Sequence, residues 1–259
     1  KEGNPNVEIL NTSNNYQILC EAIGLNPYHY ICIYSREDNY LNKRFPNNDW
    51  SYHSCRNSDI NKKKLLTEYI LKNSNLSVVR VGSCVNNSIN WKFKNNDNKT
   101  NKFIDYSTSE YQNDKNDIDI IAGCNLFICE GGGLSIVAHT SKRKTIGINQ
   151  VGIGYGIFGF IPIMIPVLIR RLSDHSYLSI KEITKLGLLF CTNSYEFKEN
   201  GLYVEENTPI DILNLYKDYL DLINNKIPDN KLEIYRKYRK FRKEIADLAN
   251  VSNINDSLI

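Results

Sequence analysis

The sequence predicts a doubly wound α/β domain, in which helices cover both faces of a parallel β-sheet, with further helices at the C-terminal end. Between residues 28 and 190, short apolar runs rich in β-branched residues alternate with segments of helical periodicity. These runs fit strands that are buried on both faces. We expect residues 1–27 to be the remnant of an N-terminal segment or a linker. Residues 28–190 would form the domain, and residues 191–259 a helical segment packed on it.

The expected elements begin with a strand and a helix. The run HYICIY at 29–34 fits a buried strand, and the segment 61–72 forms a helix with Leu65, Leu66, Tyr69 and Ile70 on one face. Further strands are expected at 77–81, 102–106, 125–129 and 144–148, and short helices at 117–122 and 134–140.

Two later helices have clear start signals. Ser179 and Glu182 form a capping-box pattern, and that helix should stop at Gly187. Thr208 and Pro209 open another, whose inner stripe is expected to hold Ile210, Leu213, Leu220 and Ile223.

The stretch 152–169 is the most apolar in the chain. A membrane-spanning helix needs about 20 apolar residues. Pro162, Pro166 and four glycines interrupt this stretch, so we expect a buried loop and strand rather than a membrane span.

Composition excludes several classes of protein. The net charge of +3 is too small to imply nucleic-acid binding, and the basic residues cluster only near the C-terminus. The seven cysteines are scattered without a C-x-x-C pair, which argues against a disulfide framework and a zinc site and indicates a reducing cytosol. The first residues lack the pattern of a secretory signal, and an N-terminal portion is expected to be missing.

A glycine triplet is the sharpest local feature. Gly131, Gly132 and Gly133 follow the strand at 125–129 and precede a helix that contains Ser135. Glycines let backbone N–H groups approach a phosphate, and a helix N-terminus adds a partial positive charge. The spacing is neither G-x-G-x-x-G nor a Walker loop. A diphosphate site and a plain tight turn are both consistent with this stretch.

Charged residues follow the other expected strands. Arg36 and Glu37 come after the first strand, where an Arg can clamp phosphate or pair with the neighbouring acid. Arg80 ends an apolar strand and should reach an anion or a carboxylate, because an unpaired buried charge is costly. Asp105 also ends a strand, where it could cap a turn.

A fourth segment, Arg56-Asn57-Ser58-Asp59, precedes the helix at 61–72. Capping explains Ser58 or Asp59, but it does not explain Arg56 and Asn57. The four histidines are dispersed and no D-x-D motif occurs, so we expect no metal site and no cofactor.

The segment 231–245 predicts a basic amphipathic helix. It carries seven basic and two acidic residues, with an apolar stripe on one side. Such a helix can lie on an anionic membrane surface or pack its stripe on the domain.

Six short motifs, in this order, carry a resemblance: YICIYSRED, SYHSCRNSDI, VVRVGS, FIDYSTSE, NLFICEGGGLSIVAH and LSIKEI. Between Tyr30 and Gly187 the chain resembles a family of bacterial glycosyltransferases found with surface-polysaccharide genes. It is distantly similar to the nucleotide-sugar domain of fucosyltransferase-type GT-B enzymes, which implies a Rossmann-like domain of the GT-B C-terminal type.

The resemblance implies roles for several residues. Arg36 matches the arginine that holds the donor diphosphate, and the small-residue turn matches Gly132, Gly133 and Ser135. Further matches are Arg56, Asn57 and Asp59 in a Y-R-N-x-D-I motif with Cys55 in place of Tyr, Arg80 and Gly82 in R-x-G, and Asp105 and Tyr106 in D-Y. Of these, Arg56, Asn57 and Arg80 are expected to help bind the donor. The family has His at the position of Ser35. It has Thr or Ser near the position of Glu130, and this glutamate is expected to repel the donor phosphates.

We therefore expect a cytoplasmic, metal-independent glycosyltransferase that moves a sugar from a nucleotide-sugar to a glycan, lipid-linked or protein acceptor. Arg36 and the turn from Gly131 to Ser135 would stabilise the leaving diphosphate. Asp59, Asp105 and Glu37 are unranked candidates for the general base. Two alternatives are a non-catalytic nucleotide-sugar or glycan-binding module, and a scaffold held at the inner face of the membrane by the basic helix.

Overall fold

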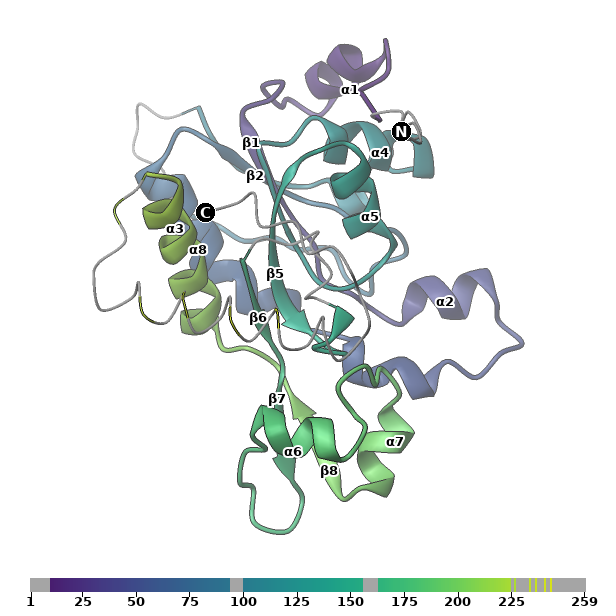
Figure 1. The fold of residues 1–259 in the computed structure, drawn as a ribbon. Helices are drawn as coiled ribbons and strands as arrows, with labels where there is room; N and C mark the ends of the chain where they lie inside the picture. Colours follow the sequence, from purple (N-terminus) through teal and green to yellow (C-terminus); the bar gives the residue numbers. More distant parts are fainter. Residues whose placement is uncertain are drawn as a thin grey trace, which may run out of the picture.

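The computed structural model describes residues 10–93, 100–155 and 163–224, and five isolated positions beyond them, 226, 233, 236, 240 and 243. Its centre is a parallel sheet with strand order β3-β2-β1-β4-β5-β6 (Figure 1). The strands are β1 (Tyr30–Ile33), β2 (Ser77–Arg80), β3 (Phe103–Asp105), β4 (Leu126–Cys129), β5 (Lys144–Gln150) and β6 (Ile163–Pro166). The predicted parallel α/β fold is confirmed, and β1 and β4 are the central pair from which the chain winds outward in both directions.

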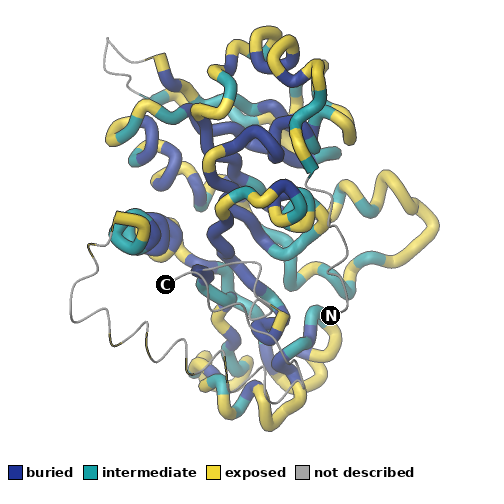
Figure 2. The backbone as a smooth tube through the Cα atoms, turned by 45° about the horizontal axis from the view of Figure 1, so that its top comes forward, coloured by how far each residue is buried: buried dark blue, intermediate teal, exposed yellow. Residues whose placement is uncertain are grey.

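Helices cover both faces of this sheet. One face carries α1 (Tyr16–Ala22), α4 (Asp114–Ala122) and α5 (Gly133–Thr140), and the other carries α3 (Lys64–Asn73) and α8 (Pro209–Ile223) (Figure 1). The strands between them are buried, while the outer sides of the helices and most turns are exposed (Figure 2). Successive strand residues therefore feed two separate hydrophobic cores, as the two-residue period of a strand requires.

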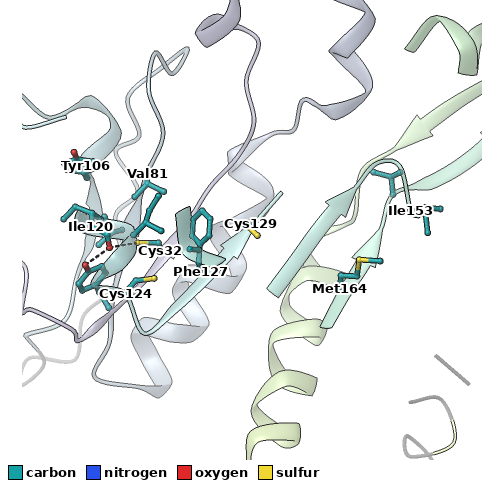
Figure 3. Packing of buried hydrophobic residues seen from close by; sticks show 14 of the residues in the cluster. Cys32, Val81, Tyr106, Ile120, Cys124, Phe127, Cys129, Ile153 and Met164 are labelled. Carbon is teal, nitrogen blue, oxygen red and sulfur yellow. Dashed lines mark hydrogen bonds between the residues drawn. The ribbon is translucent and has the colours of Figure 1, made fainter. Parts of the chain in front are cut away.

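The core on the α4 side brings together Cys32, Phe127 and Cys129 from the central strands (Figure 3). Tyr106, at the start of the short helix η3 (Tyr106–Thr108), and Ile120 of α4 close this core from above the sheet. The Ile120 carbonyl oxygen accepts a hydrogen bond from the Tyr30 hydroxyl at 2.7 Å. The side of the sheet that faces α4 is thus closed by packing, which leaves its carboxyl edge as the place for a site.

The predicted inner stripes of the two helices that cover the second face are confirmed in part, since Leu213 and Leu220 of α8 pack against the core as expected. In α3 the buried residues include Leu66 and Ile70 as expected, but Leu65 is 39% exposed. In α8 the expected Ile210 and Ile223 are exposed, and the buried stripe is Ile212, Leu213, Leu215, Tyr216 and Tyr219. The prediction favoured aliphatic residues, whereas large tyrosine rings fill the space between α3 and α8.

Helix starts follow their caps. α4 begins at Asp114, before the predicted position, because the Asn113 side chain accepts a hydrogen bond from the Asn116 N–H. The predicted capping box at Ser179 is present and opens α6 (Ile180–Lys185), and a second box at Thr208 opens α8. Gly187 follows α6 with a φ of 72°, the left-handed conformation that favours glycine after a helix.

A small antiparallel sheet lies beyond the main one and was not predicted. It pairs β7 (Leu168–Arg171) with β8 (Leu202–Glu205), and α6 and α7 (Ser194–Glu199) lie beside it (Figure 1). The apolar stretch 152–169 thus contributes β6 and the start of β7, while residues 156–162 lie outside the described residues. No described helix has the length and apolar character needed to cross a membrane.

The two ends of the chain differ in what the structure describes. Helix α1 buries Tyr16, Leu19 and Cys20 in the α4-side core, and Ser13 before it donates two hydrogen bonds to Asp119 of α4, each at 2.6 Å. This N-terminal segment therefore belongs to the packed domain. Most of the basic segment 231–245 lies outside the described residues, so its membrane role stays a prediction.

Candidate functional site

A pocket of about 470 Å³ lies at the carboxyl edge of the sheet, over the β1–β4 pair. In doubly wound sheets this switch in winding direction is where ligands bind. Its walls come from the ends of β1, β2 and β4, the first turns of α4 and α5, and the segment after β1 that holds α2 (Asn39–Arg44) and the 3-10 helix η1 (Ser51–Arg56). The lining residues are Tyr34, Ser35, Arg36, Glu37, Tyr40, Leu41, Trp50, His53, Arg56, Gly82, Ser83, Val85, Asp114, Asp117, Ile118, Gly132, Gly133, Leu134 and Val137.

Arg36 lies in this pocket and forms no ion pair with any side chain that the structure describes. Its backbone N–H donates to Glu130 Oε2 at 2.8 Å, and its Nη1 donates to Asn57 Oδ1 at 2.8 Å and to the His53 carbonyl oxygen at 3.3 Å. Both partners of the guanidinium are neutral. These hydrogen bonds hold the side chain in place without neutralising it.

A second arginine reinforces the positive potential. Arg56 Nη2 donates to the Gly131 carbonyl oxygen at 3.0 Å, which links η1 to the glycine turn. Burial and then the charge of Arg56 lower the pKa of Arg36, so the two cations lie close enough to repel. Neither forms an ion pair with any residue in the described part of the chain. An anion bound between them would relieve that repulsion.

The glycine turn leaves open space at the start of α5. A Cβ atom at Gly133 would meet nothing within 4 Å, and one at Gly132 would meet only the Tyr34 ring at 3.8 Å. Gly132 is the N-cap with an extended φ of 174°, so the backbone there does not require glycine. The first N–H groups of a helix have no intrahelical partner and favour anions. The missing side chains therefore keep a helix N-terminus open to the pocket.

The other members of the turn contribute less directly. The Ser135 hydroxyl donates to the Gly132 carbonyl oxygen at 2.5 Å, so its hydrogen is used within the first turn of α5. Gly131 lies beside Gln150, whose Oε1 is 3.5 Å from where a Cβ would stand. Neither of these two residues lines the pocket.

Glu130 does not face the pocket as a free charge, which corrects the expectation that it repels phosphate. It is 1% exposed and pairs with Lys63 of η2 (Ile60–Lys63) at 2.8 Å. Ser58 donates to its carboxylate at 2.6 Å, and Asn149 donates at 2.9 Å. Lys63 Nζ also donates to Ser35 Oγ at 2.5 Å. This buried network fixes the ends of β1 and β4 beneath the arginines.

Arg80 lies apart from the two pocket arginines and is fully paired. Its Nη2 contacts Glu37 Oε1 at 2.7 Å, and its Nη1 contacts Asp105 Oδ2 at 3.3 Å and the Asn87 carbonyl oxygen at 2.8 Å. The sequence-based expectation that Arg80 reaches a carboxylate is confirmed. Two of the three candidate bases, Glu37 and Asp105, thus serve as its partners.

The third candidate base, Asp59, is exposed and caps η2 by accepting from the Asn61 N–H at 2.8 Å. It lines a second, more polar groove, together with Glu37 and Trp91, and is not among the residues of the main pocket. Of the three candidate bases, only Glu37 lines both the main pocket and the second groove.

The sequence analysis missed several pocket residues. His53 and Trp50 stack with their rings parallel within 5°, and burial, then Arg56 and Arg36, lowers the pKa of His53. Tyr34 packs beside Gly82, and burial raises its pKa to about 12. Asp117 of α4 is 3% exposed, and burial raises its pKa as well. His53 lies inside the SYHSCRNSDI motif, but nothing in the sequence marked Asp117.

Within the described residues, no group of three or more His, Cys, Asp or Glu side chains could hold a metal ion. Comparison of the chain with models of known families, with curated proteins and with solved structures finds no match.

Proposed function

We propose that the protein is a glycosyltransferase that binds a nucleotide-sugar in the pocket at the carboxyl ends of β1 and β4 and transfers its sugar to a glycan, lipid-linked or protein acceptor. The observation that carries the proposal is the unpaired charge of Arg36 and Arg56 beside the open N-terminus of α5. Two cations and a helix dipole fit a diphosphate, which carries two or more negative charges.

The pocket's other walls fit the remainder of such a ligand. Tyr34, Tyr40 and Trp50 offer aromatic surface, against which a base or a sugar ring can pack. The volume of about 470 Å³ lies within the usual range of 300–1,000 Å³ for small-molecule sites. In the reaction, Arg36, Arg56 and the α5 amides would stabilise the charge that develops on the departing diphosphate.

A direct test is isothermal titration calorimetry with UDP- and GDP-sugars. Gly133→Ala adds a methyl group where the protein itself leaves room, so we expect unchanged or slightly increased stability and weaker nucleotide-sugar binding. Arg36→Ala should lose about 1.5–3 kcal/mol of binding free energy. If both variants bind every tested nucleotide-sugar as the parent does, the proposed site is wrong.

A non-catalytic nucleotide-sugar or glycan-binding module is the second candidate. It is favoured by the positions of the three candidate bases, because Arg80 holds Glu37 and Asp105 in ion pairs and Asp59 caps a helix outside the main pocket. Hydrolysis of the bound nucleotide-sugar by the purified protein separates the two candidates. Release of free sugar that disappears in Arg36→Ala supports the enzyme, and binding without release supports the module.

A further inference from the structure

Three buried side-chain atoms in the described residues have no hydrogen-bond partner, and two of them belong to residues that line the main pocket. These are His53 Nδ1 and Asp117 Oδ1, and the third is Ser141 Oγ. Buried polar atoms are nearly always hydrogen-bonded, so an unpartnered one needs an explanation. Asp117 is the stronger case, because an unsatisfied carboxylate oxygen costs more than a neutral ring nitrogen.

One half of the Asp117 carboxylate is firmly held. Its Oδ2 accepts from Ser83 Oγ at 3.0 Å and from Gln112 Nε2 at 3.1 Å, and Gln112 Nε2 also donates to Ser83 Oγ at 2.7 Å. Ser83 lines the same pocket. The carboxylate is therefore fixed beside the pocket, with its second oxygen lacking a donor.

A second aspartate on the same helix has hydrogen-bond donors for both of its carboxylate oxygens. Asp119 is also buried, and both of its oxygens accept from Ser13 at 2.6 Å. Asp119 lies away from the pocket and ties the N-terminal segment to α4. The contrast between two aspartates of one helix indicates that the missing partner of Asp117 does not come from the packed core.

Among the described residues the Tyr106 hydroxyl is the strongest candidate for that partner, because, against the larger effect of burial, its interaction with Asp117 lowers the pKa of the aspartate. It lies near Asp117, which raises the pKa of Tyr106 through its charge after the larger effect of burial. In the structure this hydroxyl donates instead to the Tyr111 carbonyl oxygen, at 3.4 Å.

We propose that Asp117 receives a hydroxyl group of the bound ligand, from a ribose or from the transferred sugar, and so selects a hydroxylated ring in the part of the pocket beside Ser83. This inference rests on the proposed function, since it assigns the uncharged part of a nucleotide-sugar. A carboxylate accepts hydrogen bonds without donating, which matches a hydroxyl and rejects a further phosphate.

The test compares Asp117→Asn with the parent by calorimetry, using inorganic pyrophosphate, UDP, GDP, UDP-glucose and GDP-mannose. The variant should bind pyrophosphate as well as or better than the parent, because a negative charge is removed. It should bind the ring-bearing ligand about tenfold or more weakly, the size of one hydrogen bond to a charged group. Weaker binding of UDP or GDP identifies the ribose, and weaker binding of the nucleotide-sugars alone identifies the transferred sugar.

Two control variants and a stability readout keep the result clear. Asp119→Asn should lower the melting temperature and leave all affinities unchanged, whereas Asp117→Asn should keep or raise it. Tyr106→Phe should bind every ligand as the parent does. If Tyr106→Phe loses the same affinities as Asp117→Asn, the tyrosine positions the carboxylate or contacts the ligand itself, and the assignment to Asp117 alone is wrong.

Failure of this inference and failure of the proposed function look different. If Asp117→Asn keeps its nucleotide-sugar affinity within twofold while Arg36→Ala loses pyrophosphate, the hydroxyl role is overturned and the anion site stands. If the parent binds neither pyrophosphate nor any nucleotide, the proposed function is wrong, and the role of Asp117 that depends on it is wrong too.

Discussion

Two groups of arginines lie at the same edge of the sheet, and they are built in opposite ways. Arg80 at the end of β2 is paired with two carboxylates, Glu37 and Asp105. Arg36 and Arg56, near the ends of β1 and β4, meet only neutral acceptors from the protein. Because all three are held by hydrogen bonds, the difference lies in charge compensation, which separates a structural ion pair from an anion site.

The support beneath the pocket should give the largest effect on stability. Glu130→Ser removes the partner of the fully buried Lys63 and should lower the free energy of unfolding by about 3–5 kcal/mol. From the sequence alone, removal of the Glu130 charge would instead be expected to relieve repulsion of the donor phosphates. Urea denaturation measures it, and a variant that is as stable as the parent while binding nucleotide-sugar more tightly would show that Glu130 faces the ligand.

Substituting the two kinds of arginine tests the comparison itself. Arg80→Met leaves two largely buried carboxylates unpaired and should cost about 2–4 kcal/mol of stability. Arg36→Met removes a charge that already repels Arg56 and should change stability by less than about 1 kcal/mol. Equal losses in the two variants, by urea denaturation, would mean that Arg36 is as structural as Arg80.

The sequence predicts the strands of the sheet better than it predicts the side-chain contacts of the site. Apolar runs were enough to locate β1 to β5, because the inner strands of a parallel sheet are buried on both faces and even the edge strand β3 is partly buried. Arg36 and the glycine turn were found because they directly follow strands. Side-chain pairing was not predictable: Glu130 meets Lys63 and Arg80 meets Glu37 only after the chain has folded, across 67 and 43 residues.

Local pattern also fails where a residue's role depends on what surrounds it. Asp117 reads as an ordinary acid in the first turn of a helix, and only its burial beside Ser83 distinguishes it from Asp114. Tyr216 of α8 was not part of the predicted inner stripe, yet its ring is buried and packs against Tyr69 of α3.

The pH dependence of stability should show a smaller effect at Asp117. Burial raises the pKa of Asp117 above its ordinary value of 3.8, so the folded state holds this proton more tightly than the unfolded chain does. The parent therefore loses stability as pH rises from 3.8 through the folded-state pKa. Asp117→Asn lacks this loss, so its stability advantage over the parent should grow as the pH rises toward neutrality.

Urea denaturation of both proteins from pH 4 to pH 8 measures this difference. A gap that stays constant across the series, or that favours the parent at neutral pH, would show that the Asp117 carboxylate is stabilised in the folded protein.

We propose that Arg36 and Arg56 are a cationic pair kept open for an anion, and titration with inorganic pyrophosphate tests this most directly. Calorimetry on the parent, Arg36→Ala and Arg56→Ala at low and high salt isolates the anion from every other part of a ligand. We expect the parent to bind, each variant to bind about tenfold or more weakly, and salt to weaken the parent more than either variant. If pyrophosphate binds all three proteins equally, or binds none of them, the pocket is not an anion site.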